Sequence, residues 1–326
     1  MKESIIEEIE QKMQPLLDNG QKEQFSKILK YCLANYEIVE VNDSKQEEIA
    51  YVDLFIGAKK IEGKSDKTLD YYRSTIEKMA DEISKQVNHI TTEDLRQYLS
   101  NYQEVHHSSK VTIDNIRRIL SSFFGWLEDE DYIIKSPVRR IHKVKTTKSI
   151  KETYSDESLE LMRDNCESIR DLALIDILAS TGMRVGELVL LNKDDINFNE
   201  RECIVLGKGD KERTVYFDAR TKMHLHKYLS ERTDSNEALF VSLRYPYERL
   251  KIGGVEARLR KFGRHLGINK VHPHKFRRTL ATMAIDKGMP IEQLQQLLGH
   301  QRIDTTLQYA MVKQSNVKLS HRKYIG

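Results

Sequence analysis

The chain has 326 residues, of which 39% are apolar and 32% charged, and its formal net charge is +3. It has no apolar run of about 18 residues, so we expect no transmembrane helix, and its first residues lack the basic and apolar regions of a signal peptide. The three cysteines lie far apart in a pattern that fits neither a zinc site nor a disulfide framework, which indicates the reducing cytoplasm.

Residues 1–46 are predicted to form a helical N-terminal extension. Apolar residues recur at helical spacing, and Pro15 and the pair Asn19-Gly20 interrupt the pattern. Residues 1–45 carry six Lys and nine Asp or Glu, a net charge of −3, so the rest of the chain is +6. Because its acidic balance opposes a DNA role, we expect this helical hairpin to contact protein, within the chain or on a neighbour.

Residues 47–133 are predicted to form a domain of four or five helices. Its last helix, within IRRILSSFFGWLED, has a wide apolar face. Arg117 and Arg118 flank that face, where solvation by water and contact with DNA phosphates would explain them equally well. We therefore take both arginines as DNA-binding candidates.

Residues 134–153 are predicted to form a basic linker between two domains. Pro137 ends the preceding helix, and the stretch that follows is rich in Lys and Arg and has no acidic residue before Glu152. Most such runs are solvated connectors, but between two domains that close on a duplex the run would equally follow the phosphate backbone. The linker adds four DNA-binding candidates: Arg139, Arg140, Lys143 and Lys145.

The second domain is predicted to follow this linker. Residues 169–180 are apolar nearly all round, so we expect a deeply buried helix that ends at Thr181-Gly182. Arg184 then stands at the start of the next helix, where free N–H groups attract anions. The sequences ECIVLG and RTVYF predict a β-hairpin with Lys208 in its turn.

Three helices are predicted at the end of this domain, over 273–287, 290–298 and 303–312. They carry His274 and Arg277 in the pattern H-x-x-R, then His300 after a glycine, and finally Tyr309. These are the side chains needed to bind a phosphate, move a proton and attack. Taken alone, each of them would equally suit an ordinary core or surface position.

Two further arginines complete the DNA-binding candidates. Arg258 lies on a basic helix predicted over 254–266, and Arg278 directly follows Arg277. Arg278 would add a phosphate contact or only a surface charge, and we favour the surface. Glu187 would pair with a nearby arginine and orient it, or cap its own helix.

The chain resembles the tyrosine recombinase, or phage integrase, family in four segments that follow in order: STGMRVGELVLLNKDDI, LGKGDKERTVYF, HPHKFRRTLAT and LLGHQRIDTTLQY. The preceding stretch, 47–140, is similar to the helical core-binding domain of that family. The resemblance implies a mainly α fold with a small β-hairpin or sheet, arranged as a two-domain DNA clamp. Its parts would be the helical core-binding domain, a mixed α/β catalytic domain over 154–312, and a C-terminal tail over 313–326.

Carried over residue by residue, the resemblance assigns the active site of the family to six residues: Arg184, Lys208, His274, Arg277, His300 and Tyr309. It implies that Tyr309 attacks a DNA phosphate, forms a 3′-phosphotyrosyl bond and releases a 5′ hydroxyl. Attack by the 5′ hydroxyl of a partner strand then reseals the DNA. The resemblance implies no metal and no nucleotide cofactor.

The chemistry of these side chains agrees with such roles. A phenol has an ordinary pKa near 10, so the tyrosine must lose its proton as it attacks, and His274 would be the base. The fork-shaped guanidinium groups of Arg184 and Arg277 suit two phosphate oxygens. His300 would donate another hydrogen bond to the phosphate, and Lys208 would protonate the leaving 5′ oxygen.

The resemblance implies double-stranded DNA recombination sites as partners, a homo-tetramer on synapsed DNA, a monomer or weak oligomer when free, and no membrane. The acidic helical start differs from the basic arm-binding domain of larger integrases, which favours a simple Xer-like recombinase. A type IB topoisomerase and a catalytically silent DNA-binding protein remain the alternatives. Integration, excision, inversion and resolution are equally compatible with the sequence.

The tail over 313–326 has two interpretations. Its basic residues would contact DNA as a disordered segment, or the tail would dock on the neighbouring subunit of a cyclic tetramer, as the resemblance implies. We expect these two roles to differ in their effect on synapsis and on the salt dependence of binding.

Overall fold

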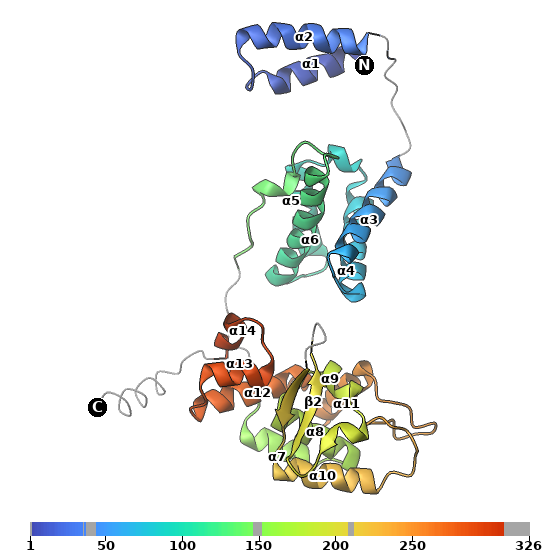
Figure 1. Cartoon of the computed structure of the whole chain (residues 1–326), viewed down its shortest axis with the longest axis vertical. Helices are drawn as coiled ribbons and strands as arrows, with labels where there is room; N and C mark the ends of the chain where they lie inside the picture. Colours follow the sequence, from blue (N-terminus) through green and yellow to red (C-terminus); the bar gives the residue numbers. More distant parts are fainter. Residues whose placement is uncertain (1, 35, 37–43, 146–151, 208–211, 310–326) are drawn as a thin grey trace, which may run out of the picture. The chain divides into compact units, whose positions relative to one another are not determined.

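The structure is a computed structural model that describes residues 2–34, 36, 44–145, 152–207 and 212–309 (Figure 1). The chain divides into two compact units, Met1–Lys148 and Ser149–Gly326. The tail predicted over 313–326 and the predicted turn residue Lys208 lie outside the described residues. Among the described residues, every helix is too short or too polar to cross a lipid bilayer.

The first unit begins with two helices that run side by side, α1 (Lys2–Met13) and α2 (Asn19–Leu33) (Figure 1). The expected break at Asn19-Gly20 is wrong, because these residues open α2. The carboxylate of Asp18 accepts from the Gln21 backbone N–H at 2.8 Å, and the Gln21 side chain accepts from the Asp18 backbone. This capping box, with Asp18 as the N-cap, lets the helix begin at Asn19.

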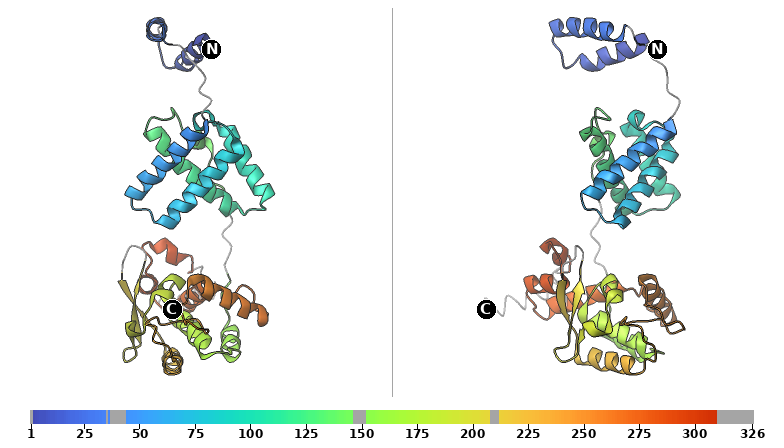
Figure 2. Two further views of the ribbon diagram at one scale, coloured as in Figure 1. Left: turned by 90° about the vertical axis from the view of Figure 1, so that its right-hand side faces the viewer. Right: turned by 45° about the vertical axis from the view of Figure 1, so that its right-hand side comes forward.

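Four α-helices follow in the same unit: α3 (Ser44–Ile61), α4 (Asp66–Ile83), α5 (Thr92–Val105) and α6 (Lys110–Asp129). They surround a core in which Phe55 and Phe123 meet edge to face, with ring centroids 5.3 Å apart. Two views of this bundle show α3 and α4 packed along their length (Figure 2).

The first half of the predicted linker belongs to the packing of this unit. Val138, within a 3₁₀ turn over Pro137–Arg140, is 2% exposed in the same core as Phe123. The backbone N–H of Val144 donates to the buried Asp114 carboxylate at 3.1 Å. These contacts fix the basic stretch against α6 up to that residue.

The second unit contains eight α-helices among the described residues: α7 (Asp156–Asp164), α8 (Ile169–Thr181), α9 (Val185–Leu190), α10 (Ala219–Ser230), α11 (Ile252–His265), α12 (Pro273–Asp286), α13 (Ile291–Leu298) and α14 (Ile303–Leu307). Helix α8 runs through its centre, packed against α10 and α12. The predicted deep burial of this apolar helix is confirmed.

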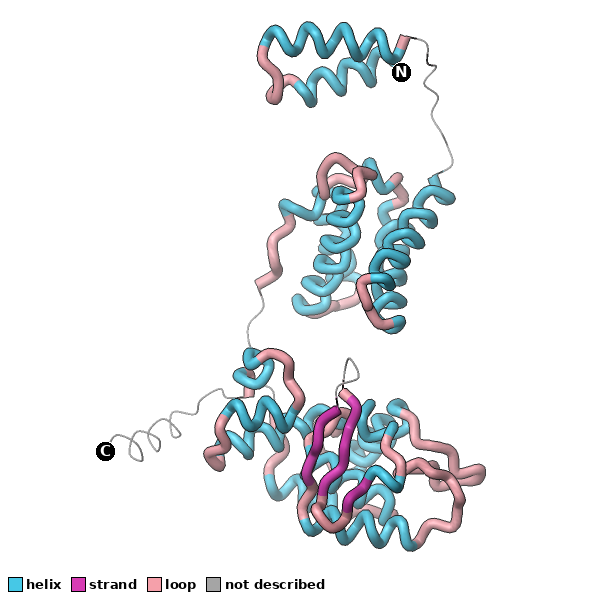
Figure 3. Tube along the Cα trace, viewed as in Figure 1, coloured by secondary structure: helices cyan, strands magenta, loops and turns pink. Residues whose placement is uncertain are grey.

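Three antiparallel strands form one small sheet in the order β1 (Ile196–Asn197), β2 (Glu202–Leu206) and β3 (Glu212–Tyr216) (Figure 3). Cys203 pairs with Val215, and both side chains are buried. The predicted hairpin is β2–β3. Strand β1 was not predicted, because two residues are too few to show an alternating pattern.

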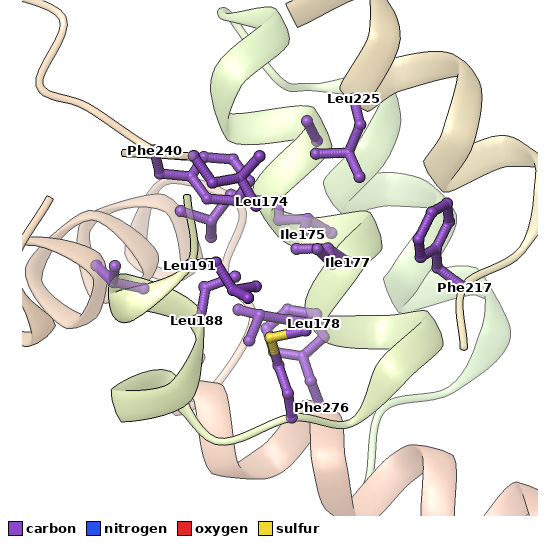
Figure 4. Close-up of a cluster of buried hydrophobic side chains, with 14 of the residues drawn as sticks. Leu174, Ile175, Ile177, Leu178, Leu188, Leu191, Phe217, Leu225, Phe240 and Phe276 are labelled. Carbon is purple, nitrogen blue, oxygen red and sulfur yellow. The ribbon is translucent and has the colours of Figure 1, made fainter. Parts of the chain in front are cut away.

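The core of the second unit lies between α8, the sheet and the flanking helices. Leu174, Ile177 and Leu178 of α8 lie in one buried cluster with Leu188 of α9 and Phe276 of α12 (Figure 4). Because this core fixes the end of α8, the start of α9 and the first turns of α12 against one another, it positions the segments that carry the candidate site.

The last described helix is shorter than predicted. Helix α14 ends at Leu307, whereas the sequence pattern predicted a helix over 303–312. Tyr309 follows in a turn, and its backbone N–H donates to the Thr306 carbonyl at 2.9 Å. The candidate nucleophile therefore lies just beyond a helix end.

Candidate active site

The turn between α8 and α9 places the first arginine of the site. Gly182 ends α8 in the left-handed conformation, with φ of +60°, and a Cβ there would lie 2.6 Å from Leu280. Glycine is the residue that fits both constraints. The chain then leads through Met183 to Arg184, which precedes the first turn of α9.

Glu187 holds Arg184 in place from the first turn of α9. Its carboxylate accepts from the Arg184 backbone N–H at 2.7 Å and from Arg184 Nη1 at 2.8 Å. Burial favours the neutral acid, but hydrogen bonds from Arg213 and Arg184 outweigh it, so the pKa of Glu187 is lowered. The pairing role that the sequence suggested for Glu187 is present, and it also caps the helix.

Arg277 is the buried arginine of the site, with 1% of its surface exposed. Its Nη1 donates to the Gly182 carbonyl at 2.8 Å, and its Nη2 donates to the Leu298 carbonyl. Burial, reinforced by the neighbouring charges of Arg184 and Arg213, lowers its pKa to about 10. The guanidinium thus stays charged at neutral pH while it links α12 to the ends of α8 and α13.

His300 lies against this guanidinium. Nη2 of Arg277 is 2.9 Å from His300 Nε2, and His300 Nδ1 is 2.8 Å from Thr306 Oγ1. Burial and then the charge of Arg277 lower the pKa of His300 to about 4, so the ring is neutral near pH 7. Since the guanidinium can only donate, Nε2 is the acceptor and Nδ1 carries the proton, an assignment inferred from these partners.

This arrangement differs from the expected role of His300. The sequence suggested that it donates a hydrogen bond to phosphate, whereas its Nε2 accepts from Arg277 in the structure. To donate from Nε2, the ring must change tautomer or gain a proton.

Tyr309 completes this side of the site. Its ring stacks on His300, with centroids 6.0 Å apart and planes at 21°, and 9% of the residue is exposed. It packs with Leu294 and Leu298 of α13 in a small apolar cluster. His300 and Tyr309 are therefore neighbours in the structure.

His274 reaches the site from the first turn of α12. It is exposed and lines a cavity of about 420 Å³ together with Arg184, Arg277, Arg260 and Glu256. The structure thus brings His274 and both arginines to one cavity, and Arg277 connects them to His300 and Tyr309. The sixth predicted residue, Lys208, lies outside the described residues.

Arg213 is part of this cluster, and sequence reasoning missed it. It projects from β3 and forms two hydrogen bonds of 2.7 Å with the Glu187 carboxylate. The sequence placed Arg213 on a strand, but no local pattern indicates its partner 26 residues away. The nearest signal was the expectation that Glu187 pairs with an arginine.

Within the described ranges, no group of three or more His, Cys, Asp or Glu side chains is placed to hold a metal ion.

Three of the arginines predicted to bind DNA from the first unit have carboxylate partners. Arg117 Nε and Arg118 Nε lie 2.9 and 3.0 Å from the two oxygens of the buried Asp114. Arg139 pairs with Glu128 at 3.2 Å. Arg117 is the most enclosed of the three, with 14% of its side chain exposed, so its charge is balanced largely within the protein.

The other DNA-binding candidates fall into two groups. Arg140, Lys143 and Lys145 are exposed. Arg258 instead donates to the buried Asp171 at 2.6 Å, and Arg278 donates to the Glu152 carbonyl at 2.8 Å. Because of that bond to Asp171, Arg258 is poorly placed to bind phosphate through the same nitrogen.

Comparison with protein-family models gives two matches. The Phage integrase family matches residues 148–316, and the Phage integrase, N-terminal SAM-like domain matches residues 52–134. The two matches together span most of both units.

Two similar proteins are named tyrosine recombinase XerC. The protein from Oceanobacillus iheyensis is 32% identical over 84% of this chain and 95% of its own length. The protein from Staphylococcus aureus strain MRSA252 is 29% identical over 82% of this chain and 93% of its own length.

Among solved structures, XerH site-specific recombinase bound to a palindromic difH substrate matches with a TM-score of 0.68. The match is 21% identical and covers 90% of this chain and 93% of that chain. At this identity the likeness concerns the fold.

Proposed function

The chain belongs to the phage integrase family, and on that premise we propose that Tyr309 cuts and rejoins DNA at the cavity lined by Arg184, His274 and Arg277. The enzyme is a tyrosine recombinase that acts in site-specific recombination, with DNA as its partner. One observation carries the residue assignment: Arg277 joins the cavity to His300, and His300 stacks on Tyr309.

The two arginines have different surroundings that suit them to one phosphate. Arg277 is buried and held by backbone carbonyls, so its position is fixed before DNA arrives. Arg184 has 39% of its side chain exposed, and its Nη2 makes only a long hydrogen bond of 3.5 Å to the Gly299 carbonyl. Together they would offset the charge that grows on the two non-bridging oxygens in the transition state. An arginine in such a position contributes about 10³–10⁵ in rate in phosphoryl transfer.

Proton transfer in this proposal uses residues on opposite sides of the phosphorus. The Tyr309 oxygen forms a bond to phosphorus as its proton passes to His274, the exposed histidine of the cavity. The bond from phosphorus to the 5′ oxygen breaks, and Lys208 gives that oxygen a proton. The 3′ end remains joined to Tyr309 until a partner 5′ hydroxyl attacks and reverses these transfers.

At the level of assembly, we place the enzyme as a homo-tetramer on two synapsed DNA sites and as a monomer or weak oligomer when free. The family membership supports this arrangement. A tetramer on two sites is equally compatible with a role in the movement of mobile DNA and with a role in the resolution of repeated DNA.

Replacement of the nucleophile tests the proposal directly. Tyr309→Phe should bind duplex DNA as the wild type does but form no covalent protein–DNA band on a denaturing gel, because it lacks the attacking oxygen. Tyr216→Phe is the matched control, since Tyr216 is an exposed tyrosine on β3 of the same unit. An adduct formed by Tyr309→Phe would place the nucleophile elsewhere.

A two-site assay separates recombination from the alternatives. The wild type should exchange strands between two DNA sites, whereas a type IB topoisomerase would relax supercoiled DNA without joining them. A protein that binds DNA and forms no adduct would be catalytically silent.

A further inference from the structure

Glu187 is shared by two arginines, and each of its carboxylate oxygens accepts one hydrogen bond from each of them. One carboxylate oxygen, Oε1, accepts from Arg184 Nη1 at 2.8 Å and from Arg213 Nη1 at 2.7 Å. The other, Oε2, accepts from the Arg184 backbone N–H and from Arg213 Nη2, both at 2.7 Å. Arg213 thus makes the two-pronged pair with the carboxylate, and Arg184 is left with one side-chain bond to it.

Arg213 is itself held rigidly. Its side chain is 11% exposed, and its Nε donates to the Leu297 carbonyl at the end of α13 at 3.2 Å. Gly299, with φ of +62°, leaves the space that Arg213 occupies, since a Cβ there would lie 2.8 Å from Arg213 Cδ. The arginine therefore has one orientation, defined by β3, α9 and the segment that leads to His300.

The buried negative charge of Glu187 explains why the pairing with Arg213 matters for Arg184. Glu187 is 5% exposed, and a buried carboxylate needs a paired cation. With Arg213 in place, that need is met by its two-pronged pair, and Arg184 Nη2 is left with only the 3.5 Å bond to the Gly299 carbonyl. Without Arg213, the carboxylate would draw Arg184 into a two-pronged pair of its own, turning its donors away from the cavity. Arg277 is anchored by the Gly182 carbonyl, so it is poorly placed to replace Arg213.

We infer that Arg213 is a positioning residue: by pairing with both oxygens of Glu187, it limits Arg184 to one side-chain bond with that carboxylate and leaves the other guanidinium donors of Arg184 to bind the scissile phosphate. The inference rests on the proposed function, because it concerns the arginine that would bind that phosphate. Arg213 itself touches no reacting atom in this role.

The test compares three substrates in single-turnover cleavage by the full-length protein. One carries the natural phosphate, one a methylphosphonate that lacks a non-bridging charge, and one a sulfur at the 5′ bridging position. Arg213→Gln should slow cleavage of the natural phosphate by about 10²-fold, the loss typical of a misplaced group. The loss relative to wild type should shrink markedly with methylphosphonate, because less charge remains for Arg184 to offset. It should persist with the sulfur substrate, which relieves only the need for an acid.

Two further variants keep the test decisive if Arg213→Gln folds poorly. Arg213→Lys retains the charge without the fork, so it should recover part of the natural-phosphate rate. Arg213→Gln combined with Glu187→Gln removes the unpaired charge, so it should cleave faster than Arg213→Gln alone. Failure of both variants to exceed Arg213→Gln would overturn the inference.

Arg232→Gln is the matched structural control. Arg232 is also a buried arginine that pairs with a carboxylate, Asp234, and donates to backbone carbonyls, but it lies at the end of α10 away from the cavity residues. Its replacement should lower stability without substrate-selective rescue. If Arg213→Gln behaves like this control, or is rescued by sulfur instead, Arg213 does not act through Arg184. If the wild type forms no adduct at all, the proposed function fails first.

Discussion

The protonation state of His300 depends on its neighbours as well as on the imidazole ring itself. Burial and the adjacent Arg277 lower its pKa from the ordinary 6.5 to about 4. Between these values the unfolded chain binds a proton that the folded chain does not. The unfolding free energy therefore falls as the pH drops through this window. His300 lowers it least above about pH 6.5, where the ring is neutral in both the folded and the unfolded chain.

We accordingly expect His300→Gln to flatten the pH dependence of stability. The unfolding free energy of the wild type should fall as pH drops from about 6.5 toward 4, and the variant should lose part of that slope because it cannot take up the proton. Denaturant titrations at several pH values measure the difference. Parallel curves for the two proteins would mean that His300 titrates alike when folded and unfolded.

Lys208 is the proposed acid, and chemistry can identify it even though it lies outside the described residues. Lys208→Ala should cleave natural DNA slowly, because the leaving alkoxide lacks a proton donor. A substrate with sulfur at the 5′ bridging position should restore the rate, since a thiolate leaves without a proton. An equal defect on both substrates would assign Lys208 to phosphate binding.

At the scale of elements, the end of α8 determines where a catalytic arginine lies. Gly182 closes the helix with a positive φ, and its carbonyl accepts from Arg277. The same backbone conformation that ends the helix thus supplies an anchor for the site. This hydrogen bond joins the end of α8 to an arginine of α12 that lies 95 residues later in the chain.

Gly182→Ala should therefore reduce both stability and activity. The left-handed conformation alone costs an alanine about 1–2 kcal/mol, and its Cβ would lie 2.6 Å from Leu280. Cleavage should also slow, because a displaced Gly182 carbonyl would shift Arg277.

Gly253→Ala is the control, because its Cβ would meet nothing within 4 Å in α11, and it should change the unfolding free energy by less than about 0.5 kcal/mol. Thermal melts and single-turnover cleavage measure the two effects, and a Gly182→Ala protein equal to wild type in both would contradict them.

At the scale of the whole molecule, charge is distributed unevenly along the chain. Residues 1–45 have a net charge of −3 and the remainder +6, which favours the later segments for the binding of DNA. Affinity for DNA should fall steeply with salt, because each neutralised phosphate releases counterions. Among the predicted basic contacts, Arg140, Lys143 and Lys145 are exposed, whereas Arg117 and Arg258 pair with the buried carboxylates of Asp114 and Asp171.

This division gives a prediction for binding. Replacing the exposed Arg140 and Lys143 with Gln should reduce the salt slope of DNA affinity by about 0.9 for each phosphate that the protein no longer neutralises. Arg258→Gln should leave that slope nearly unchanged and lower stability instead, because Arg258 pairs with the buried Asp171. Gel-shift titrations over a salt series distinguish them. A slope that falls for Arg258→Gln but not for the double variant would reverse the assignment.

The amino-acid pattern alone predicted most of the helices and the β2–β3 hairpin, and the resemblance of four segments to the phage integrase family supplied the candidate residues. An apolar composition nearly all round predicted the buried helix α8, and the wide apolar face of IRRILSSFFGWLED predicted α6. The resemblance assigned Arg184, His274, Arg277, His300 and Tyr309 to phosphate chemistry, and their residue types suit that chemistry. Both kinds of information are local in the chain.

Only the tertiary structure decided how those residues are held. Arg213 meets Glu187 across 26 residues, Arg277 meets Gly182 across 95, and Arg258 meets Asp171 across 87. A side chain has the same letter whether it is buried against a carboxylate or exposed, so local pattern cannot separate positioning from surface arginines. Burial and pairing arise when distant segments pack on one core, and that packing set the charge state of His300 and the partners of Arg184, Arg213 and Arg277.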